Sequence, residues 1–322
     1  MTASTNMRQA LTKIRRALSR QDIAPELTQY LVQGGTISAY DGRFVACCPV
    51  AYEGTFLVPG REFEAILDRL PDEFVIGLEK DAVTLSAGRL RGTIRLLPPA
   101  TATFPQPSPD WVTPPVNFLP ALRLARPYIS DNAIYSWALC VSLEFNLMRA
   151  TTNVSLVEVD CFDLDASGQL LPSWSIDYIL SRSERLTGVQ VHPEYAAFLF
   201  EDKSWMRTQL VTGKFPEQGK NLFTEFKSPN WELTPEWKSA YKTMAELTES
   251  EIAIYPDKLV GVRGKGTAEC SIVTRAQENG VKFNPEFLNP VIDIATHIDF
   301  EVYPQPVPFC APGLRGLVVG RR

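Results

Sequence analysis

One stretch of the sequence occurs three times, and its spacing constrains the fold more than any other feature. In each copy a short strand-like segment with at least one apolar residue leads into a proline, and apolar residues then recur at the spacing of one helix face. The prolines are Pro59, Pro172 and Pro285, at an interval of 113 residues in both cases (172 − 59 and 285 − 172). A proline suits the first turn of a helix, because its φ is fixed near the helical value and an N–H would have no partner there. Three such helix starts at one period predict a unit repeated three times.

The length of the chain agrees with three domains of ordinary size. At 322 residues it is too long for one ordinary core, and three units of roughly 105 to 110 residues fit the usual domain size. Five prolines between residues 105 and 115 exclude a helix or a central strand there and predict a linker. The predicted division is 1–104 for the first domain, 105–115 for the proline-rich linker, 116–217 for the second domain and 218–322 for the third. A further linker segment is expected at 217–230.

Each predicted domain has the same order of elements. A first helix is expected at 7–20, 118–130 and 234–247, with Thr234 as the N-cap of the third. Short alternating strands follow, among them two strands around Gly34 and Gly35 and a turn at Asp41 and Gly42. The repeated helix and more strands complete the unit. This order predicts an α+β fold in which two helices per domain pack on antiparallel sheet, and edge strands join one unit to the next.

Basic residues accompany these helices on faces away from the apolar positions. The net charge is −5, which argues against a protein coated in basic residues, but a local basic surface can still attract a polyanion. An ordinary solvated helix face is the alternative for each group of charges. If the helices all face one way, the charges form a surface that suits loose contact with a phosphate backbone. The basic residues on the first helices are Lys13, Arg16, Arg20, Arg123, Arg126, Lys238 and Lys242.

The sequence offers no good candidate for a catalytic, metal or cofactor site. The six cysteines include no CxxC pair, so buried thiols are expected rather than zinc. The segment 163–168 imitates the start of a calcium loop, but Trp174 stands at the twelfth position, where calcium needs a glutamate. There is no Walker loop and no nucleophile elbow. No apolar run is long enough to span a membrane and no signal peptide is evident, so a cytoplasmic protein that is not an enzyme is expected.

The whole chain resembles the bacterial sliding clamp, the beta subunit of the replicative DNA polymerase. The resemblance is carried by the joint spacing of AYDGRFVA at 39–46, the first repeated helix with the strands after it, ATTNVSLVEV at 150–159, LVTGKFPE at 210–217, and FNPEFLNPVI through the closing LVVGRR at 283–322. It implies a ring of two three-domain chains joined head to tail, with helices around the hole and sheet outside. Such a ring encircles double-stranded DNA without reading its sequence, and confers processivity on the polymerase. It would act in the replisome. The residues expected to line the hole and contact DNA are the basic residues of the first helices together with Arg182 and Arg185.

The resemblance also implies a groove that binds short peptide motifs of the DNA polymerase and the clamp loader. Carried over by motif, its residues are Ala138, Thr151, Asn153, Val154, Leu156, Pro216, Lys220, Leu317, Val319 and Arg321. The family usually has glycine where Asn153 stands and a proline near Gly320, so an altered partner motif is expected. The chain is also shorter than most bacterial members, which suits a bacteriophage or otherwise divergent clamp.

Two other classes of protein stay open at the level of sequence. A non-enzymatic viral or assembly subunit built from repeated domains would form oligomers without affinity for circular DNA. A nuclease or another DNA-processing enzyme would need a clustered acidic metal site, and no motif supplies one.

Overall fold

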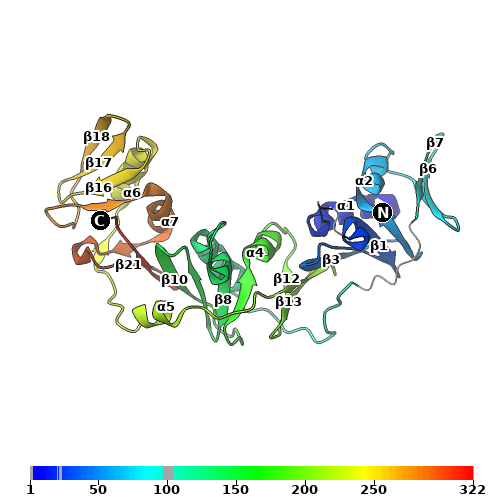
Figure 1. Ribbon diagram of the computed structural model, residues 1–322, viewed down its shortest axis with the longest axis horizontal. Helices are drawn as coiled ribbons and strands as arrows, with labels where there is room; N and C mark the ends of the chain where they lie inside the picture. Colours follow the sequence, from blue (N-terminus) through cyan, green and yellow to red (C-terminus); the bar gives the residue numbers. More distant parts are fainter. Residues whose placement is uncertain (1–2, 20, 22–23, 97–103, 322) are drawn as a thin grey trace. The chain divides into compact units, whose positions relative to one another are not determined.

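The computed structural model describes residues 3–19, 21, 24–96 and 104–321 (Figure 1). The chain divides into two compact units. Unit 1 comprises Met1–Pro114 and Asp177–Leu210, and unit 2 comprises Pro115–Ile176 and Val211–Arg322. These two units differ from the three domains that the sequence repeat predicts, and the three-domain division stays a prediction.

A seven-stranded antiparallel sheet forms the centre of unit 1. Its strand order is β12-β13-β14-β3-β2-β1-β4. The bounds are β1 Gln29–Gln33, β2 Thr36–Tyr40, β3 Phe44–Pro49, β4 Phe56–Pro59, β12 Leu186–Val191, β13 Tyr195–Phe200 and β14 Trp205–Gln209. The turns at Gly34, Gly35 and Gly42 have positive φ, as hairpin turns require, and lie where the sequence predicts them. β14 pairs with β3, so strands from the first and second predicted domains form one sheet.

Two helices and a smaller sheet complete unit 1. The α1 helix (Ala3–Ile14) packs on β2 and β3, with Met7 and Ile14 fully buried. It ends six residues before the predicted end at residue 20, and a 3₁₀ turn at Arg15–Ala17 follows. The α2 helix (Gly60–Leu67) contacts β4 and β7, and its Phe63 and Leu67 are buried. The smaller sheet has the order β5-β6-β7, with bounds Val75–Leu78, Ala82–Ala87 and Leu90–Arg95.

An eight-stranded antiparallel sheet forms the centre of unit 2. Its order is β11-β8-β9-β10-β22-β21-β20-β15. The bounds are β8 Cys140–Glu144, β9 Leu147–Thr151, β10 Ser155–Asp160, β11 Gln169–Pro172, β15 Trp231–Glu232, β20 His297–Ile298, β21 Val307–Ala311 and β22 Leu314–Val318. β10 pairs with β22, so strands far apart in the sequence lie side by side. The residues 163–168 form a turn between β10 and β11, in keeping with a structural role.

The remaining elements of unit 2 pack on this sheet or on a four-stranded sheet. α3 (Phe118–Ala125) packs on β9 and β10, and a 3₁₀ turn at Arg126–Tyr128 replaces the rest of the predicted helix, where Pro127 interrupts it. α6 (Pro235–Glu246) contacts α7 (Pro285–Ile294) and β17. The four-stranded sheet has the order β18-β17-β16-β19, with bounds Gly266–Ser271, Lys258–Arg263, Glu251–Ile254 and Val281–Phe283.

The three copies of the repeated stretch form three helices that begin at matching positions. They are α2, α4 (Ser173–Leu180) and α7, and they begin one residue after Pro59, one residue after Pro172 and at Pro285. Asn284 caps α7 by accepting a hydrogen bond from the Glu286 N–H. Thr234 caps α6 as predicted, since its Oγ1 accepts from the Trp237 N–H at 3.2 Å. The α+β class and these helix positions are confirmed.

One helix and part of the cysteine prediction differ from expectation. α5 (Glu217–Leu222) lies in the segment expected as a second linker. Cys47, Cys48, Cys140 and Cys161 are buried, whereas Cys270 and Cys310 are partly exposed. Among the described residues, no helix is long and apolar enough to cross a membrane.

Candidate functional site

The residues predicted to form a peptide-binding groove all lie in unit 2, on segments that the sheet brings together. Leu156 on β10 is the register partner of Leu317 on β22. Ala138 lies in a 3₁₀ turn before β8, and Lys220 lies in α5. Thr151, Asn153 and Val154 belong to the β9–β10 hairpin, whereas Val319 and Arg321 follow β22.

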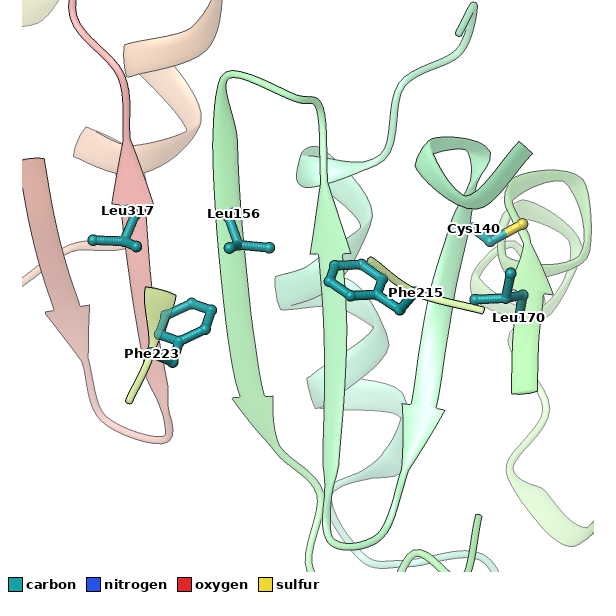
Figure 2. Close-up of a cluster of buried hydrophobic side chains, with 6 residues drawn as sticks. All are labelled: Cys140, Leu156, Leu170, Phe215, Phe223 and Leu317. Carbon is teal, nitrogen blue, oxygen red and sulfur yellow. The ribbon is translucent and has the colours of Figure 1, made fainter. Parts of the chain in front are cut away.

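Apolar side chains from these segments form one cluster, which we call the groove cluster (Figure 2). Figure 2 shows the Phe223 ring beside Leu317. Leu317 and Leu156 lie on neighbouring strands of the same sheet. Partly buried Trp137, Leu139, Val211 and Phe226 pack against the cluster. Two of the predicted groove residues, Leu156 and Leu317, thus belong to one buried apolar cluster. The members of the cluster are Cys140, Leu156, Leu170, Phe215, Phe223 and Leu317.

The β9–β10 hairpin has a backbone conformation that explains the residue at position 153. Asn153 has a φ of 71°, in the left-handed region that glycine and asparagine tolerate best. Its N–H donates to Thr151 Oγ1 at 3.0 Å, and the Thr151 hydroxyl donates to the Ser155 carbonyl at 2.8 Å. Asparagine can therefore adopt the left-handed conformation that this turn requires, and its side chain is exposed.

The end of the chain is tied to the same surface by backbone hydrogen bonds. The Val319 N–H donates to the Val154 carbonyl at 2.8 Å, and the Arg321 N–H donates to the Lys282 carbonyl at 2.7 Å. A Cβ on Gly320 would lie 2.8 Å from the Tyr303 ring, so a larger residue needs that ring to move. The Val319 side chain remains 45% exposed, which leaves it accessible to a partner.

A row of alternating charges crosses the sheet beside the groove cluster. Glu158 on β10 is the register partner of Arg149 on β9 and of Arg315 on β22. Its carboxylate accepts from Arg149 Nε at 2.5 Å and from Arg315 Nε at 2.6 Å. Arg149 also pairs with Glu144, whose carboxylate lies 3.5 Å from Lys220 Nζ. The row therefore links the sheet to α5, and Lys220 belongs to it.

Sequence reasoning missed the aromatic residues and the arginine of this site. Phe223 and Phe226 were not predicted, because the segment 217–230 was interpreted as a linker, and Phe215 was placed at the end of the second domain without a role in the groove. The spacing of Phe223 and Phe226, three residues apart, was the available signal of a helical or turn-like apolar face. Arg315 carried no signal, because its stacking over Phe223 and Phe226 depends on pairing between distant strands.

The predicted DNA contacts in unit 1 do not share one environment. Lys13 Nζ lies 2.5 Å from both Glu184 and Asp202, and Arg182 pairs with the same two carboxylates. The Arg182 side chain is only 4% exposed and stacks over the Phe200 ring at 4.7 Å. Arg182 therefore does not present its charge to solvent as a phosphate contact should.

The other predicted cations of unit 1 are more accessible. Arg16 is exposed, and Arg15 beside it, which was not predicted, is exposed as well. Both line a hollow of about 620 Å³ between the end of α1 and residues 181–184. Arg185 is exposed and lies 3.3 Å from Glu201. Arg20 lies outside the described residues.

In unit 2 the predicted cations lie on α3, on the turn after it and on α6. Arg123 is exposed, and Arg126 pairs with Asp131 at 3.0 Å. Lys242 lies 2.6 Å from Asp293 of α7. Partial burial, with the nearby Lys242 charge, lowers the pKa of Lys238. An added phosphate would relieve that repulsion, so the Lys238 and Lys242 pair suits an anion better than a cation.

Acid is expected to destabilise the fold through Glu184 and Asp202. Burial alone would raise the pKa of each carboxyl, but hydrogen bonds from Lys13 and other donors outweigh burial and hold the pKa values below the ordinary 4.5 and 3.8. Such groups stabilise the folded chain above the unfolded pKa, and this contribution is lost as the pH falls through the folded pKa. We expect the urea midpoint to fall as the pH drops below about 5, through the lowered pKa values of these two carboxyls. Asp202→Asn should make the urea midpoint depend less on pH in this range. The control Asp163→Asn, at an exposed site, should leave the dependence as in the wild type. If both variants show the same pH dependence, Asp202 does not have this role.

No protein-family model matches the chain, and no curated protein matches it by sequence. Solved structures do match it. The Helicobacter pylori beta clamp bound to a DNA ligase peptide has 15% sequence identity and a TM-score of 0.81, over 99% of this chain and 98% of that one. The Caulobacter crescentus DNA polymerase sliding clamp has 18% identity and a TM-score of 0.80, over 99% and 98%. A putative DNA polymerase III beta subunit from Eubacterium rectale has 12% identity and a TM-score of 0.80, over 100% and 98%.

These matches extend over essentially the whole of each chain, as does the resemblance carried by the sequence motifs. At 12–18% identity the likeness concerns the fold. The chain has the fold of the bacterial beta sliding clamps.

Proposed function

We propose that the protein is a DNA sliding clamp, a ring of two chains that encircles duplex DNA and holds a DNA polymerase on its template. The observation that carries this proposal is the match to beta clamps over 99% of the chain, at a TM-score of about 0.8. A ring retains DNA by topology, so it needs only weak phosphate contacts that ions screen, and it can slide. In this proposal the protein has no catalytic role and acts in the cytoplasm, at the replisome.

The sheet edges support head-to-tail joining of two chains. In unit 1 β7 ends the three-stranded sheet, and in unit 2 β18 ends the four-stranded sheet, within the described parts of the chain. Both strands are largely exposed. Exposed edges offer free N–H and C=O groups to a further strand, and joining unlike edges is a heterologous contact that closes when the rotation closes. The three-domain division at 1–104, 116–217 and 218–322 belongs to this proposal.

The exposed cations support a DNA-facing role for part of the predicted set. We assign phosphate contacts to Arg16, Arg123, Arg126, Arg185, Lys238 and Lys242, and to Arg20 from the sequence alone. Lys13 and Arg182 differ from these residues because each pairs with two carboxylates, those of Glu184 and Asp202, and we assign both to the stability of unit 1. Arg15 joins the set, because it lines the same hollow as Arg16.

Partner binding is proposed for the groove cluster and its surroundings. The Helicobacter pylori clamp binds a DNA ligase peptide. A partly buried apolar surface with a few polar groups at its rim suits a short peptide segment. By analogy we propose that peptide segments of the DNA polymerase and of the clamp loader dock on the groove cluster, with Thr151, Asn153, Val154 and Val319 at its rim and Ala138, Pro216 and Arg321 nearby.

Retention on circular DNA tests this function. We expect light scattering to give a dimer, and we expect the loaded protein to stay on nicked circular DNA through a salt wash and to leave the same DNA once it is linearised. Arg16→Glu with Arg123→Glu should shorten retention and weaken its dependence on salt, by up to about 0.9 in log–log slope per lost phosphate contact. The matched control Arg43→Glu with Lys214→Glu, two exposed cations outside the set, should behave as wild type. Equal retention on circles and linear DNA would contradict the ring, and oligomers without DNA affinity would favour an assembly protein.

A further inference from the structure

The groove cluster is covered in part by a segment of the protein itself, residues 217–226, which we call the strap. The strap consists of α5 and the turn after it. Phe223 of the strap is 4% exposed and lies in the cluster with Leu156 and Leu317. A Cβ on Gly219 would lie 3.2 Å from the Phe215 ring and 3.7 Å from Leu156. The α5 backbone at Gly219 therefore lies close to two members of the groove cluster, Phe215 and Leu156. Two predicted groove residues are therefore buried by the protein's own chain.

Few interactions fix the strap in this position. α5 has six residues, none of them buried, and its N-cap Pro216 makes no side-chain capping bond. A helix of this length is unstable alone, because the conformational entropy lost in forming its first turn outweighs the free energy gained from the few hydrogen bonds it makes. The strap is attached instead by Phe223 within the groove cluster, by Phe226 packed against that cluster, by Arg315 over both rings, and by the pair between Lys220 and Glu144. Loss of the ring contacts would leave little to keep α5 in place.

The residues beneath the strap are held in place by contacts that do not involve the strap. Arg315 stacks over Phe223 at 5.1 Å and over Phe226 at 5.7 Å, while its guanidinium is fixed by Glu158 on the neighbouring strand. Leu156 and Leu317 are held by the β10–β22 pairing. If Phe223 leaves, an apolar site remains with a fixed guanidinium at its wall. Such a site favours an aromatic side chain, which gains both apolar burial and a cation–π contact.

We propose that the strap is an internal occupant of the peptide groove, and that a partner binds by inserting an aromatic side chain in place of Phe223. This inference rests on the proposed function, because it assumes that partner peptides dock on the groove cluster. Binding then requires the strap to leave, so the apparent dissociation constant is the intrinsic one divided by the fraction of molecules with the strap released. The strap thereby weakens all partners and favours those that carry the aromatic residue.

Peptide affinity tests the proposal. The probes are labelled short peptides that tile the DNA polymerase of the same organism, titrated with the full-length protein in fluorescence polarisation. Phe223→Ala should bind the best peptide about tenfold more tightly than wild type, because the released state no longer has to be populated at a cost. Phe162→Ala, an exposed aromatic in a separate loop, should leave affinity unchanged. Replacing the aromatic residue of the peptide by alanine should abolish the gain.

Hydrogen exchange on the unmodified protein gives a second readout that does not depend on a folded variant. If the strap leaves, amide exchange in residues 217–226 should rise when the peptide binds, while exchange in β10 and β22 falls. Weaker binding by Phe223→Ala, together with slower exchange in the strap, would make Phe223 a fixed wall of the groove and overturn the inference while leaving the proposed function intact. Binding by neither the wild type nor Phe223→Ala would overturn both.

Discussion

Arg182→Ala is expected to lower the free energy of unfolding by about 3 kcal/mol, a loss of more than a hundredfold in the folding equilibrium. The side chain is nearly buried and pairs with Glu184 at 2.9 Å and Asp202 at 3.3 Å, and it donates to Ser204 Oγ at 2.7 Å. Removing one member of a buried ion-pair group leaves its partners short of compensation, and here a packed guanidinium over Phe200 is lost as well. Urea unfolding at pH 7, followed by circular dichroism, measures the change.

Arg185 provides a matched control three residues further along the chain. Its pair with Glu201 is exposed on both sides, so Arg185→Ala should cost less than about 0.5 kcal/mol. Arg182→Lys keeps the charge but not the fork of donors, and an intermediate loss is expected. If Arg182→Ala were as stable as Arg185→Ala but lost retention on circular DNA, Arg182 would be a DNA contact and our structural assignment would fail.

The repeated helices could be predicted from the sequence because their signal is local. Proline at a helix start and apolar residues at helical spacing act within one or two turns, and the structure has helices at Gly60, Ser173 and Pro285. The same holds for the Thr234 cap. The α1 helix is shorter than its pattern, since the apolar spacing continues through Leu18 although the backbone changes to a 3₁₀ turn after Ile14.

The environment of a charge could not be predicted in the same way. Lys13, Arg16 and Arg182 look alike in sequence, yet Lys13 and Arg182 face carboxylates from 184 and 202, whereas Arg16 is exposed. Asp202 lies in the turn between β13 and β14, and Glu184 lies just before β12, so their meeting depends on the pairing of β12, β13 and β14 in one sheet. A periodicity argument places a residue on a face, but it does not say what that face contacts.

The predicted groove includes residues that the sequence could indicate and residues that only tertiary contacts reveal. Leu156 and Leu317 were found through a resemblance in motif, and strand pairing brings them into register. Phe223 was missed because a short helix without buried residues has almost no apolar period, and only the tertiary contact with the cluster gives it a role. Asn153 was noted as a departure from glycine, and its positive φ explains how the turn survives it.

Glu158→Ala is expected to cost about 3 kcal/mol of unfolding free energy, because it removes the only carboxylate between two arginines on adjacent strands. Glu158 is 5% exposed, and the Arg149 side chain beside it is 12% exposed, so Arg149 would keep Glu144 alone as its charged partner among the described residues. Arg315 is half exposed and can be hydrated instead, which limits the loss. Glu158→Gln keeps an acceptor but not the charge, so a smaller loss is expected.

A double-mutant cycle separates the pair between Glu158 and Arg315 from the rest of this loss. If the two side chains act together, Glu158→Ala with Arg315→Ala should cost less than the sum of the single changes, by about 1 kcal/mol or more. The exposed Glu217→Ala, at the far end of the same row of charges, should cost less than about 0.5 kcal/mol. The cycle also bears on the strap, because Arg315 stacks over Phe223 while Glu158 fixes the guanidinium. Loss of Glu158 should therefore raise hydrogen exchange in residues 217–226 before global unfolding, and unchanged exchange there would mean that the charge row and the strap are independent.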